Sequence, residues 1–173
     1  MNSILETERL RLREFTTMDT EFIIQLLNSP GWLKFIGDRN VKTKDDAKAY
    51  LENGPLTSYR ENGFGLYMVE RKEDHQPIGM CGILRRITLE NPDIGFAFLP
   101  EFNSKGYAFE IASETLTFAR KKLKLPTVYA ITVPNNERSI KLLEKIGLQF
   151  IKTIQLPGGL EELQLYSTEI ELS

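Results

Sequence analysis

Ile94-Gly95-Phe96-Ala97-Phe98, with the turn Asn103-Ser104-Lys105-Gly106-Tyr107-Ala108 behind it, is the stretch that decides how this chain folds. The first segment is a short apolar run typical of a strand, and the second opens a strongly periodic helix. Such a junction presents unpaired backbone N–H groups at the positive end of the helix dipole, where phosphate or pyrophosphate binds. A turn that binds nothing is the alternative, because one glycine motif is a weak signal.

Alternating and helical patterns flank this unit on both sides. Arg9–Arg13 alternates as a half-exposed strand does, and Thr43-Lys44-Asp45-Asp46 resembles a capping box before a helix that Asn53-Gly54-Pro55 should end. The fold class is α/β, an α+β mixed sheet with helices packed against it. We predict about seven strands, at 9–13, 64–70, 78–84, 94–98, 128–133, 150–154 and 163–166, and about four helices, at 18–27, 44–51, 106–123 and 135–146.

Size and composition exclude several classes of protein. A chain of 173 residues fits one domain, 1–173, and a net charge of −2 with dispersed basic residues argues against a nucleic-acid surface. Cys81 is the only cysteine, so neither an internal disulfide nor a cysteine-based metal site can form, and we expect it in the core. We find no metal motif, no membrane span and no signal peptide, so we expect a cytoplasmic protein without a membrane partner.

A second motif follows the next predicted strand. In Val133-Pro134-Asn135-Asn136-Glu137-Arg138-Ser139, either asparagine can cap a helix, and Ser139 lies one turn in. Capping alone would explain most such matches. Two ligand-ready turns at the ends of successive parallel strands are far less common by chance, and together they outline one cleft.

The pair of motifs resembles the GNAT family of acetyl-CoA-dependent N-acetyltransferases, and within it the RimJ/RimL branch of ribosomal-protein N-terminal acetyltransferases. The resemblance rests on Thr7–Arg13, on Pro100–Ala108 with Glu110, and on Asn136–Gly147. It implies a mixed sheet whose central two strands splay apart to admit the pantetheine arm of coenzyme A. The chain also departs from the family pattern, most notably at Leu143, where many members carry a tyrosine that protonates the leaving thiolate; Asn103, Ser104 and Leu148 differ as well.

Site residues carry over from the resemblance position by position. It implies that the backbone of Asn103–Ala108 holds the pyrophosphate of acetyl-CoA, that the strand from Phe96 to Leu99 pairs with the pantetheine amides, and that Asn136 and Ser139 contact the thioester end. The predicted cofactor-binding residues are therefore Phe96, Phe98, Leu99, Asn103, Ser104, Lys105, Gly106, Tyr107, Ala108, Asn136 and Ser139.

Acetyl transfer to an amine needs a neutral amine, a stabilised oxyanion and a protonated leaving thiolate. Without a tyrosine at 143, Ser139 or a bound water is the candidate acid, with Asn136 beside it. Glu14 and Asp93 lie at predicted strand ends and are candidate bases or amine-binding groups, although such carboxylates are more often solvated. Trp32 and Phe35 could form an aromatic acceptor pocket or belong to the core.

We therefore expect an enzyme that transfers an acetyl group from acetyl-CoA to a primary amine, either a protein N-terminus or a small molecule. A catalytically silent acyl-CoA-binding or regulatory module is the alternative. A nucleotide-binding domain is disfavoured, because GxxxxGK[ST] is absent from the sequence. Such families commonly form homodimers, so a homodimer is one assembly this chain could adopt.

Overall fold

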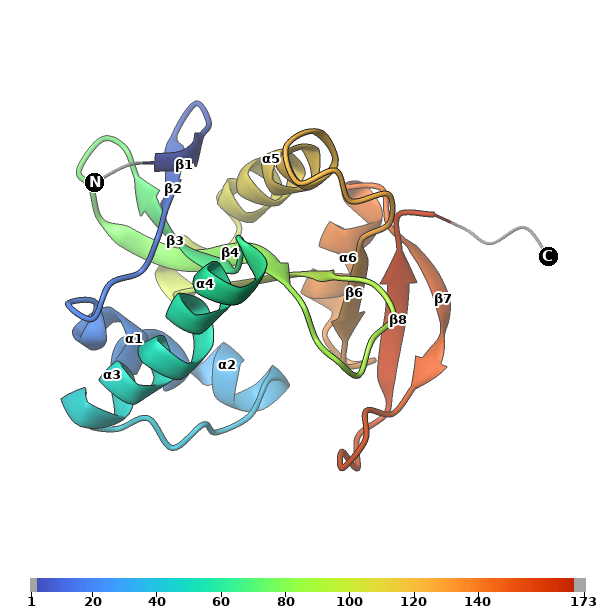
Figure 1. Cartoon of the computed structure of the whole chain (residues 1–173), viewed down its shortest axis with the longest axis horizontal. Coiled ribbons are helices and arrows are strands. Elements are labelled where there is room, and N and C mark those ends of the chain that lie inside the picture. The colour runs from blue at the N-terminus through green and yellow to red at the C-terminus, as the bar shows by residue number, and fades with distance from the viewer. Residues whose placement is uncertain (1–2, 170–173) are drawn as a thin grey trace.

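A computed structural model describes residues 3–169 as a mixed α/β fold around one sheet (Figure 1). The sheet has eight strands in the order β1-β2-β3-β4-β5-β6-β8-β7. All neighbouring strands are antiparallel except β5 and β6, which are parallel. The strands are β1 (Ser3–Glu6), β2 (Leu10–Arg13), β3 (Leu66–Arg71), β4 (Pro77–Leu84), β5 (Asp93–Phe98), β6 (Tyr129–Thr132), β7 (Gln149–Ile154) and β8 (Leu163–Ser167).

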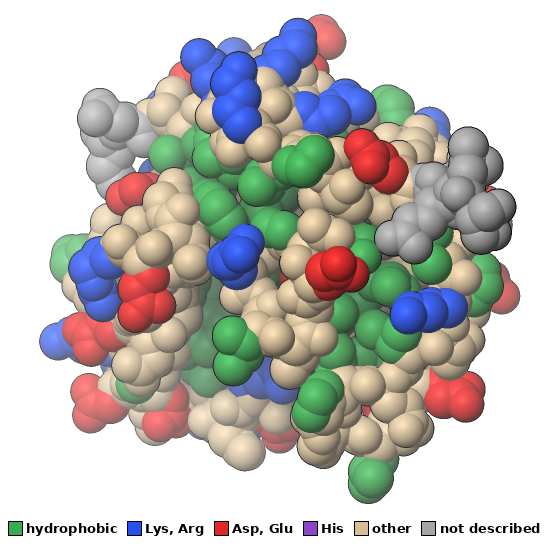
Figure 2. Space-filling view, turned by 45° about the vertical axis from the view of Figure 1, so that its right-hand side comes forward, with side chains coloured by type: hydrophobic (Ala, Val, Ile, Leu, Met, Phe, Trp, Pro, Cys, Tyr) green, Lys and Arg blue, Asp and Glu red, His purple; other side chains and the backbone are tan. Residues whose placement is uncertain are grey.

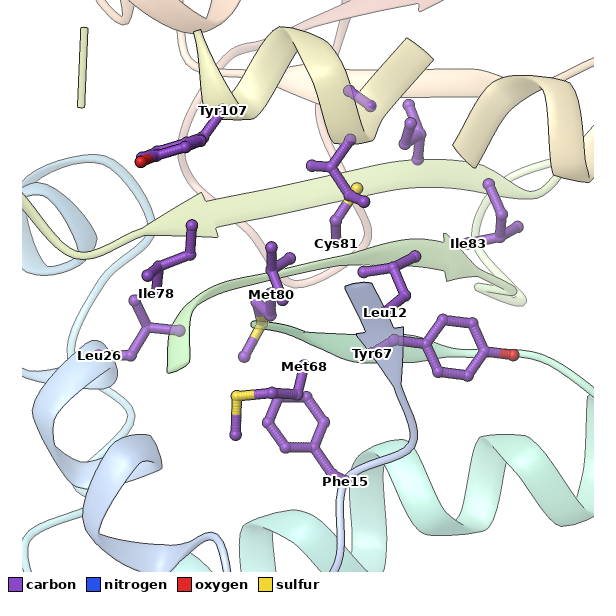
Figure 3. Close-up of a cluster of buried hydrophobic side chains, with 14 of the residues drawn as sticks. Leu12, Phe15, Leu26, Tyr67, Met68, Ile78, Met80, Cys81, Ile83 and Tyr107 are labelled. Atoms are coloured by element: carbon purple, nitrogen blue, oxygen red, sulfur yellow. The ribbon is translucent and has the colours of Figure 1, made fainter. Parts of the chain in front are cut away.

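Helices cover both faces of this sheet. The helix α5 packs on β4 and β5, with α6 against it and β6, while α1, α3 and α4 lie across the opposite face (Figures 1 and 3). The helices are α1 (Thr20–Leu27), α2 (Pro30–Phe35), α3 (Lys44–Leu51), α4 (Thr57–Asn62), α5 (Tyr107–Lys121) and α6 (Glu137–Lys145), with a π-helical turn (Glu52–Leu56) and a 3-10 turn (Pro100–Phe102).

The hydrophobic core lies on both sides of β3 and β4 (Figure 3). Every residue of β4 from Ile78 to Ile83 is buried, as expected for a strand covered on both faces. Cys81 is fully buried, and burial raises the pKa of its thiol to about 12. The expectation that it is a core residue is confirmed.

The predicted mixed sheet is confirmed with one further strand, and the structure corrects two other sequence-based expectations. The sheet has eight strands, because Ser3–Glu6 adds β1 at the edge through pairs such as Leu5↔Leu12. Asn53-Gly54-Pro55 does not end a helix, since the chain continues through the π-helical turn into α4. The wider turn accommodates proline, and Thr57 Oγ1 donates to the carbonyl of Glu52 at 2.6 Å. Met18 lies before α1 and is 87% exposed rather than on its buried face.

Between residues 3 and 169, no helix is both long enough and apolar enough to cross a membrane. The same residues contain no group of three or more His, Cys, Asp or Glu side chains placed to hold a metal ion.

Candidate functional site

The sheet opens between its only parallel strands. β5 and β6 pair at Asp93↔Tyr129 alone, with Tyr129 N donating to Pro92 O at 2.9 Å, and then diverge. Leu99 N donates to Ile78 O at 2.9 Å, which fixes the hydrogen-bonding alternation along β5. By that alternation the N–H and C=O groups of Phe96 and Phe98 face away from β4, toward the opening. The predicted splay is confirmed, and it leaves main-chain donors and acceptors facing the gap.

Two cavities, of about 440 and 520 Å³, meet at this opening. Helix α2, strand β5 and helix α6 supply the residues that line both: Trp32, Phe35, Ile36, Phe96, Ala97, Asn136 and Ser139. Figure 2 shows a hollow lined by hydrophobic side chains, with charged groups around it. We call the 520 Å³ part the turn-side cavity, because Asn103 and Ala108 line it, and the 440 Å³ part the loop-side cavity.

The turn before α5 has the geometry of an anion site. Gly106 caps the helix in the left-handed conformation (φ 81°), and the first helical hydrogen bond runs from Glu110 N to Gly106 O. The N–H groups of Tyr107 and Ala108 come before it and have no acceptor within the helix. A Cβ at Gly106 would meet Arg9 Nη2 at 3.3 Å, and the left-handed φ calls for glycine at this position.

Side chains around the turn take different directions. Ser104 also has a positive φ (63°), and it and Lys105 are exposed. The ring of Tyr107 is buried against Phe102 and beneath the Arg9 guanidinium, whose Cζ lies 4.4 Å from the ring centroid. Of the predicted turn residues, Asn103 and Ala108 line the cavity, while Ser104 and Lys105 are exposed beside it and Tyr107 is buried.

Helix α5 is fastened to the N-terminal segment by Glu110. Its Oε2 accepts from Thr7 Oγ1 (2.5 Å) and Arg9 N (2.9 Å), and its Oε1 accepts from Arg9 Nε (2.7 Å). Arg9 Nη1 also donates to Lys105 O at 3.1 Å, so it contacts the turn itself. These bonds join Thr7, Arg9 and Glu110, three residues on which the family resemblance rests, and we call them the Glu110 clamp.

The second motif lies across the opening from β5. Asn136 caps α6 by accepting from Ser139 N at 3.3 Å, and both side chains line both cavities. Leu143 follows one turn after Ser139 on the same helix and is 1% exposed in the wall of the loop-side cavity. The position of the family's tyrosine is therefore apolar in this chain.

The loop-side cavity contains an ion pair whose carboxylate is buried. Asp93 has a side chain 1% exposed, and both of its oxygens accept from Arg86 Nε, at 3.1 and 3.3 Å. Burial, which outweighs the attraction of Arg86, raises the pKa of Asp93 to about 6. Glu14 is exposed and lines neither cavity, so the structure brings only one of the two predicted carboxylates to the site.

Trp32 and Phe35 form the aromatic wall shared by the two cavities. The indole Nε1 of Trp32 is buried and has no hydrogen-bond partner among residues 3–169, which suits a wall that meets a polar ligand. Leu99 is 2% exposed and lines neither cavity, and its N–H is already paired with Ile78.

Sequence reasoning missed several charged or polar residues of the cleft. Lys34 and Arg138 line the turn-side cavity, and Arg39, Tyr50 and Arg86 line the loop-side cavity. Arg138 lies within the second motif, so that motif could have indicated it. The others come from loops and helices that converge only in the folded chain, and no local pattern marks them.

Comparisons with known proteins agree with this geometry. Residues 9–149 match the family model described as the acetyltransferase (GNAT) domain. The chain is 27% identical to the uncharacterized N-acetyltransferase YoaA of Bacillus subtilis, over 86% of this chain and 84% of that one. Among solved structures it is similar to the ribosomal-protein-S5-alanine acetyltransferase of Vibrio fischeri (TM-score 0.79, 20% identity, 100% and 98% covered).

A second solved structure carries the family's cofactor. RimL, described as a ribosomal L7/L12 alpha-N-protein acetyltransferase, was solved in complex with coenzyme A. Its TM-score to this chain is 0.80 at 14% identity, and the match covers 99% of this chain and 100% of RimL. The family match spans most of the chain, and both folds reproduce its full length. The protein therefore belongs to the GNAT acetyltransferase family, whose members transfer acetyl groups from acetyl-CoA.

Proposed function

We propose that this protein transfers the acetyl group of acetyl-CoA to a primary amine, either a protein N-terminal α-amine or the amine of a small molecule. The observation that carries the proposal is the continuous cleft at the β5–β6 opening, whose two cavities meet at Asn136 and Ser139. One cavity has the features of a coenzyme A site and the other is large enough for an acceptor. The transfer would take place where they meet.

The turn-side cavity suits coenzyme A. The free N–H groups at the start of α5 would bind the pyrophosphate, with Lys34, Arg138 and the nearby Lys105 adding positive charge. The unpaired main-chain groups of Phe96 and Phe98 would pair with the pantetheine amides as a missing strand would. Backbone contacts dominate this arrangement, which is why the departures at Asn103 and Ser104 do not weaken the proposal.

When bound, acetyl-CoA supplies an activated acetyl thioester. The residues at the junction would stabilise the two charges that develop on transfer. Main-chain N–H groups of β5 would stabilise negative charge on the carbonyl oxygen. Ser139 Oγ would donate to the departing sulfur, and the N-terminus of α6 would favour negative charge there. A coenzyme A thiol with a pKa near ~8.5, like cysteine, needs only modest help to leave.

The acceptor amine would enter the loop-side cavity. An α-amino group has a pKa of ~7.7–8.0, so a useful fraction is neutral near pH 7. Asp93, largely ionised at that pH with a pKa of about 6, would accept the proton through water. Trp32 and Phe35 would enclose the amine.

A binding titration and an activity assay test this function. Trp32 is the only tryptophan and lines both cavities, so its fluorescence should report coenzyme A binding. Thiol release from acetyl-CoA across a panel of amines reports turnover. Binding of coenzyme A without amine-dependent thiol release would instead indicate the silent acyl-CoA-binding module. Stabilisation of the folded protein by ATP and not by coenzyme A would exclude both the acetyltransferase and the acyl-CoA-binding module.

Ser139→Ala tests the role of the hydroxyl. We expect turnover to fall by about a hundred-fold, the lower end for loss of a proton donor, while coenzyme A affinity stays nearly unchanged. Ser113→Ala, on α5 and outside both cavities, is the matched control. An unchanged rate in Ser139→Ala would remove this hydroxyl from the mechanism and leave water as the acid.

A further inference from the structure

The loop-side cavity contains positive charge that acetyl transfer itself does not require. Arg39 and Arg86 line it together with Tyr50, and the family resemblance assigned a role to none of them. An amine acceptor is itself a cation when protonated, so two guanidinium groups beside it would repel a simple amine. Their presence calls for a negative charge elsewhere on the acceptor.

Arg39 is held at the cavity with its charge unpaired. The loop between α2 and α3 is fixed by Asn28, whose Nδ2 donates to Val41 O at 2.8 Å, and by the capping box of Thr43 and Asp46. The one acidic residue of that loop, Asp38, is engaged by Asn40 N and by Lys42. Within residues 3–169 Arg39 has neither an ion pair nor a hydrogen bond, so its five donors remain available.

Arg86 keeps a free edge as well. Asp93 is bound through Nε alone, and neither Nη group of Arg86 has a hydrogen-bond partner in the described part of the chain. Two Nη groups in a plane form the fork that binds carboxylate or phosphate oxygens in pairs. The ion pair with Asp93 orients this fork and leaves both of its Nη groups free.

Tyr50 lines the same cavity as the two arginines. Burial raises the pKa of its phenol, and the charges of Arg39 and Arg86 act in the opposite direction. The hydroxyl is therefore a neutral donor near pH 7, with no hydrogen bond recorded to residues 3–169. Glu161, the other carboxylate of this cavity, is exposed and has no ion pair with either arginine.

We propose that Arg39, Tyr50 and Arg86 form an anion-binding subsite, so that the acceptor carries a carboxylate or phosphate as well as its amine. The inference rests on the proposed function, since it describes the acceptor of that reaction. Charge-assisted hydrogen bonds from Arg39 should make an anionic acceptor about ten- to a hundred-fold better than its neutral analogue. The anion could belong to a free amino acid, to an acidic side chain of a peptide, or to a phosphorylated amine.

Matched pairs of acceptors separate these sources. The pairs are an amino acid and its amide, a dipeptide amide with Asp or Asn in second place, and phosphoethanolamine and ethanolamine. Each compound is measured for kcat/KM by thiol release, and for binding to the coenzyme A-loaded protein by Trp32 fluorescence. We expect the anionic member of at least one pair to exceed its neutral partner ten-fold or more, and that pair identifies the source.

Arg39→Gln should reduce this preference by weakening the anionic member of the pair much more than the neutral member, and coenzyme A binding should stay unchanged. Arg85→Gln, in the β4–β5 loop next to Arg86 but outside both cavities, is the matched control and should behave as the parent protein. Equal values within every pair, or equal losses for both members in Arg39→Gln, would overturn the subsite. Charge discrimination in the titration without any thiol release would retain the subsite and refute the proposed function instead.

Discussion

The substitution Glu110→Gln removes the charge that joins the N-terminal segment to the start of α5. Glu110 accepts three hydrogen bonds, two on Oε2 from Thr7 and Arg9 N and one on Oε1 from Arg9 Nε. Glutamine has the same shape but only one acceptor oxygen. One side of the Glu110 clamp must then face an NH₂ group, and the turn that precedes α5 loses part of its attachment to Arg9.

The expected cost follows from the bonds that are lost. A hydrogen bond to a charged group contributes about 1.5–3 kcal/mol. The Arg9 side chain is 43% exposed, so water screens the ionic part and a lower figure applies. We expect a loss of about 1–2 kcal/mol in the free energy of unfolding, which for a chain of this length lowers Tm by about 2–8 °C. Coenzyme A affinity should also fall, because a looser turn must be ordered on binding.

Urea denaturation measures the free energy of unfolding, and Trp32 fluorescence measures coenzyme A affinity; Glu114→Gln is the control for both. Glu114 lies one turn further along α5, is exposed, and has no ion pair among residues 3–169, so its substitution should change neither the free energy of unfolding nor the affinity. Burial, the largest effect, raises the pKa of Glu110, but the bonds from Thr7 and Arg9 together lower it below its usual 4.5. A carboxylate with a lowered folded-state pKa stabilises the protein above its unfolded-state pKa and loses that stabilisation as pH falls through the folded-state value.

The stability gap between parent and variant should therefore be full at pH 7 and should close below about pH 4.5. If Glu110→Gln were as stable as the control at pH 7, the Glu110 clamp would have no energetic role. If the gap persisted unchanged in acid, the charge would not be its origin.

Two further substitutions test the backbone around the cleft. Gly82→Ala places a Cβ 2.0 Å from Gly65 O, and this backbone atom cannot move aside. We therefore expect a loss of at least ~3 kcal/mol in the free energy of unfolding, or failure to fold, in a urea or expression assay. In the control Gly54→Ala the new Cβ meets no atom within 4 Å, so this variant should be tolerated in the same assay. Ser104→Gly relieves the strain of a non-glycine residue at a positive φ of 63° and should raise stability by up to about 1 kcal/mol without weakening coenzyme A binding. A clear loss of affinity would show that the serine hydroxyl, and not the backbone, contacts the cofactor.

Local patterns were enough to predict the elements that build the cleft. The strand before Asn103, the turn at Gly106 and the Asn136 cap depend on residues close together in sequence, and all three are present as expected. The prediction that the helix ends at Asn53-Gly54-Pro55 was wrong because it assumed an α-helical hydrogen-bond pattern. A π-helical turn over Glu52–Leu56 avoids that conflict, and this turn is visible only in the structure.

The acceptor side depended on contacts that no local pattern contains. Asp93 and Glu14 were equivalent in sequence, each a carboxylate at a strand end. Only Asp93 lies at the last pair of the β5–β6 ladder, where the opening begins. Arg39 comes from the loop after α2 and Tyr50 from α3, and they meet Arg86 of the β4–β5 loop only because these segments converge over the end of β5. Tertiary structure therefore decides the acceptor's chemistry.

Because position 143 carries leucine and not tyrosine, the leaving thiolate must be stabilised by other groups at the junction of the two cavities. Helix geometry places Asn136, Ser139 and Leu143 on one face, and Leu143 is sealed in the wall, 1% exposed. A tyrosine there would protonate the departing sulfur directly. With leucine, the polar groups nearest the junction lie one to two turns earlier, at the N-terminus of α6, where the helix dipole favours an anion. Stabilising a thiolate there lowers the need for an acid. Ser139→Ala should then slow turnover by about a hundred-fold without abolishing it, and the remaining rate should depend less on pH than one set by a titrating tyrosine.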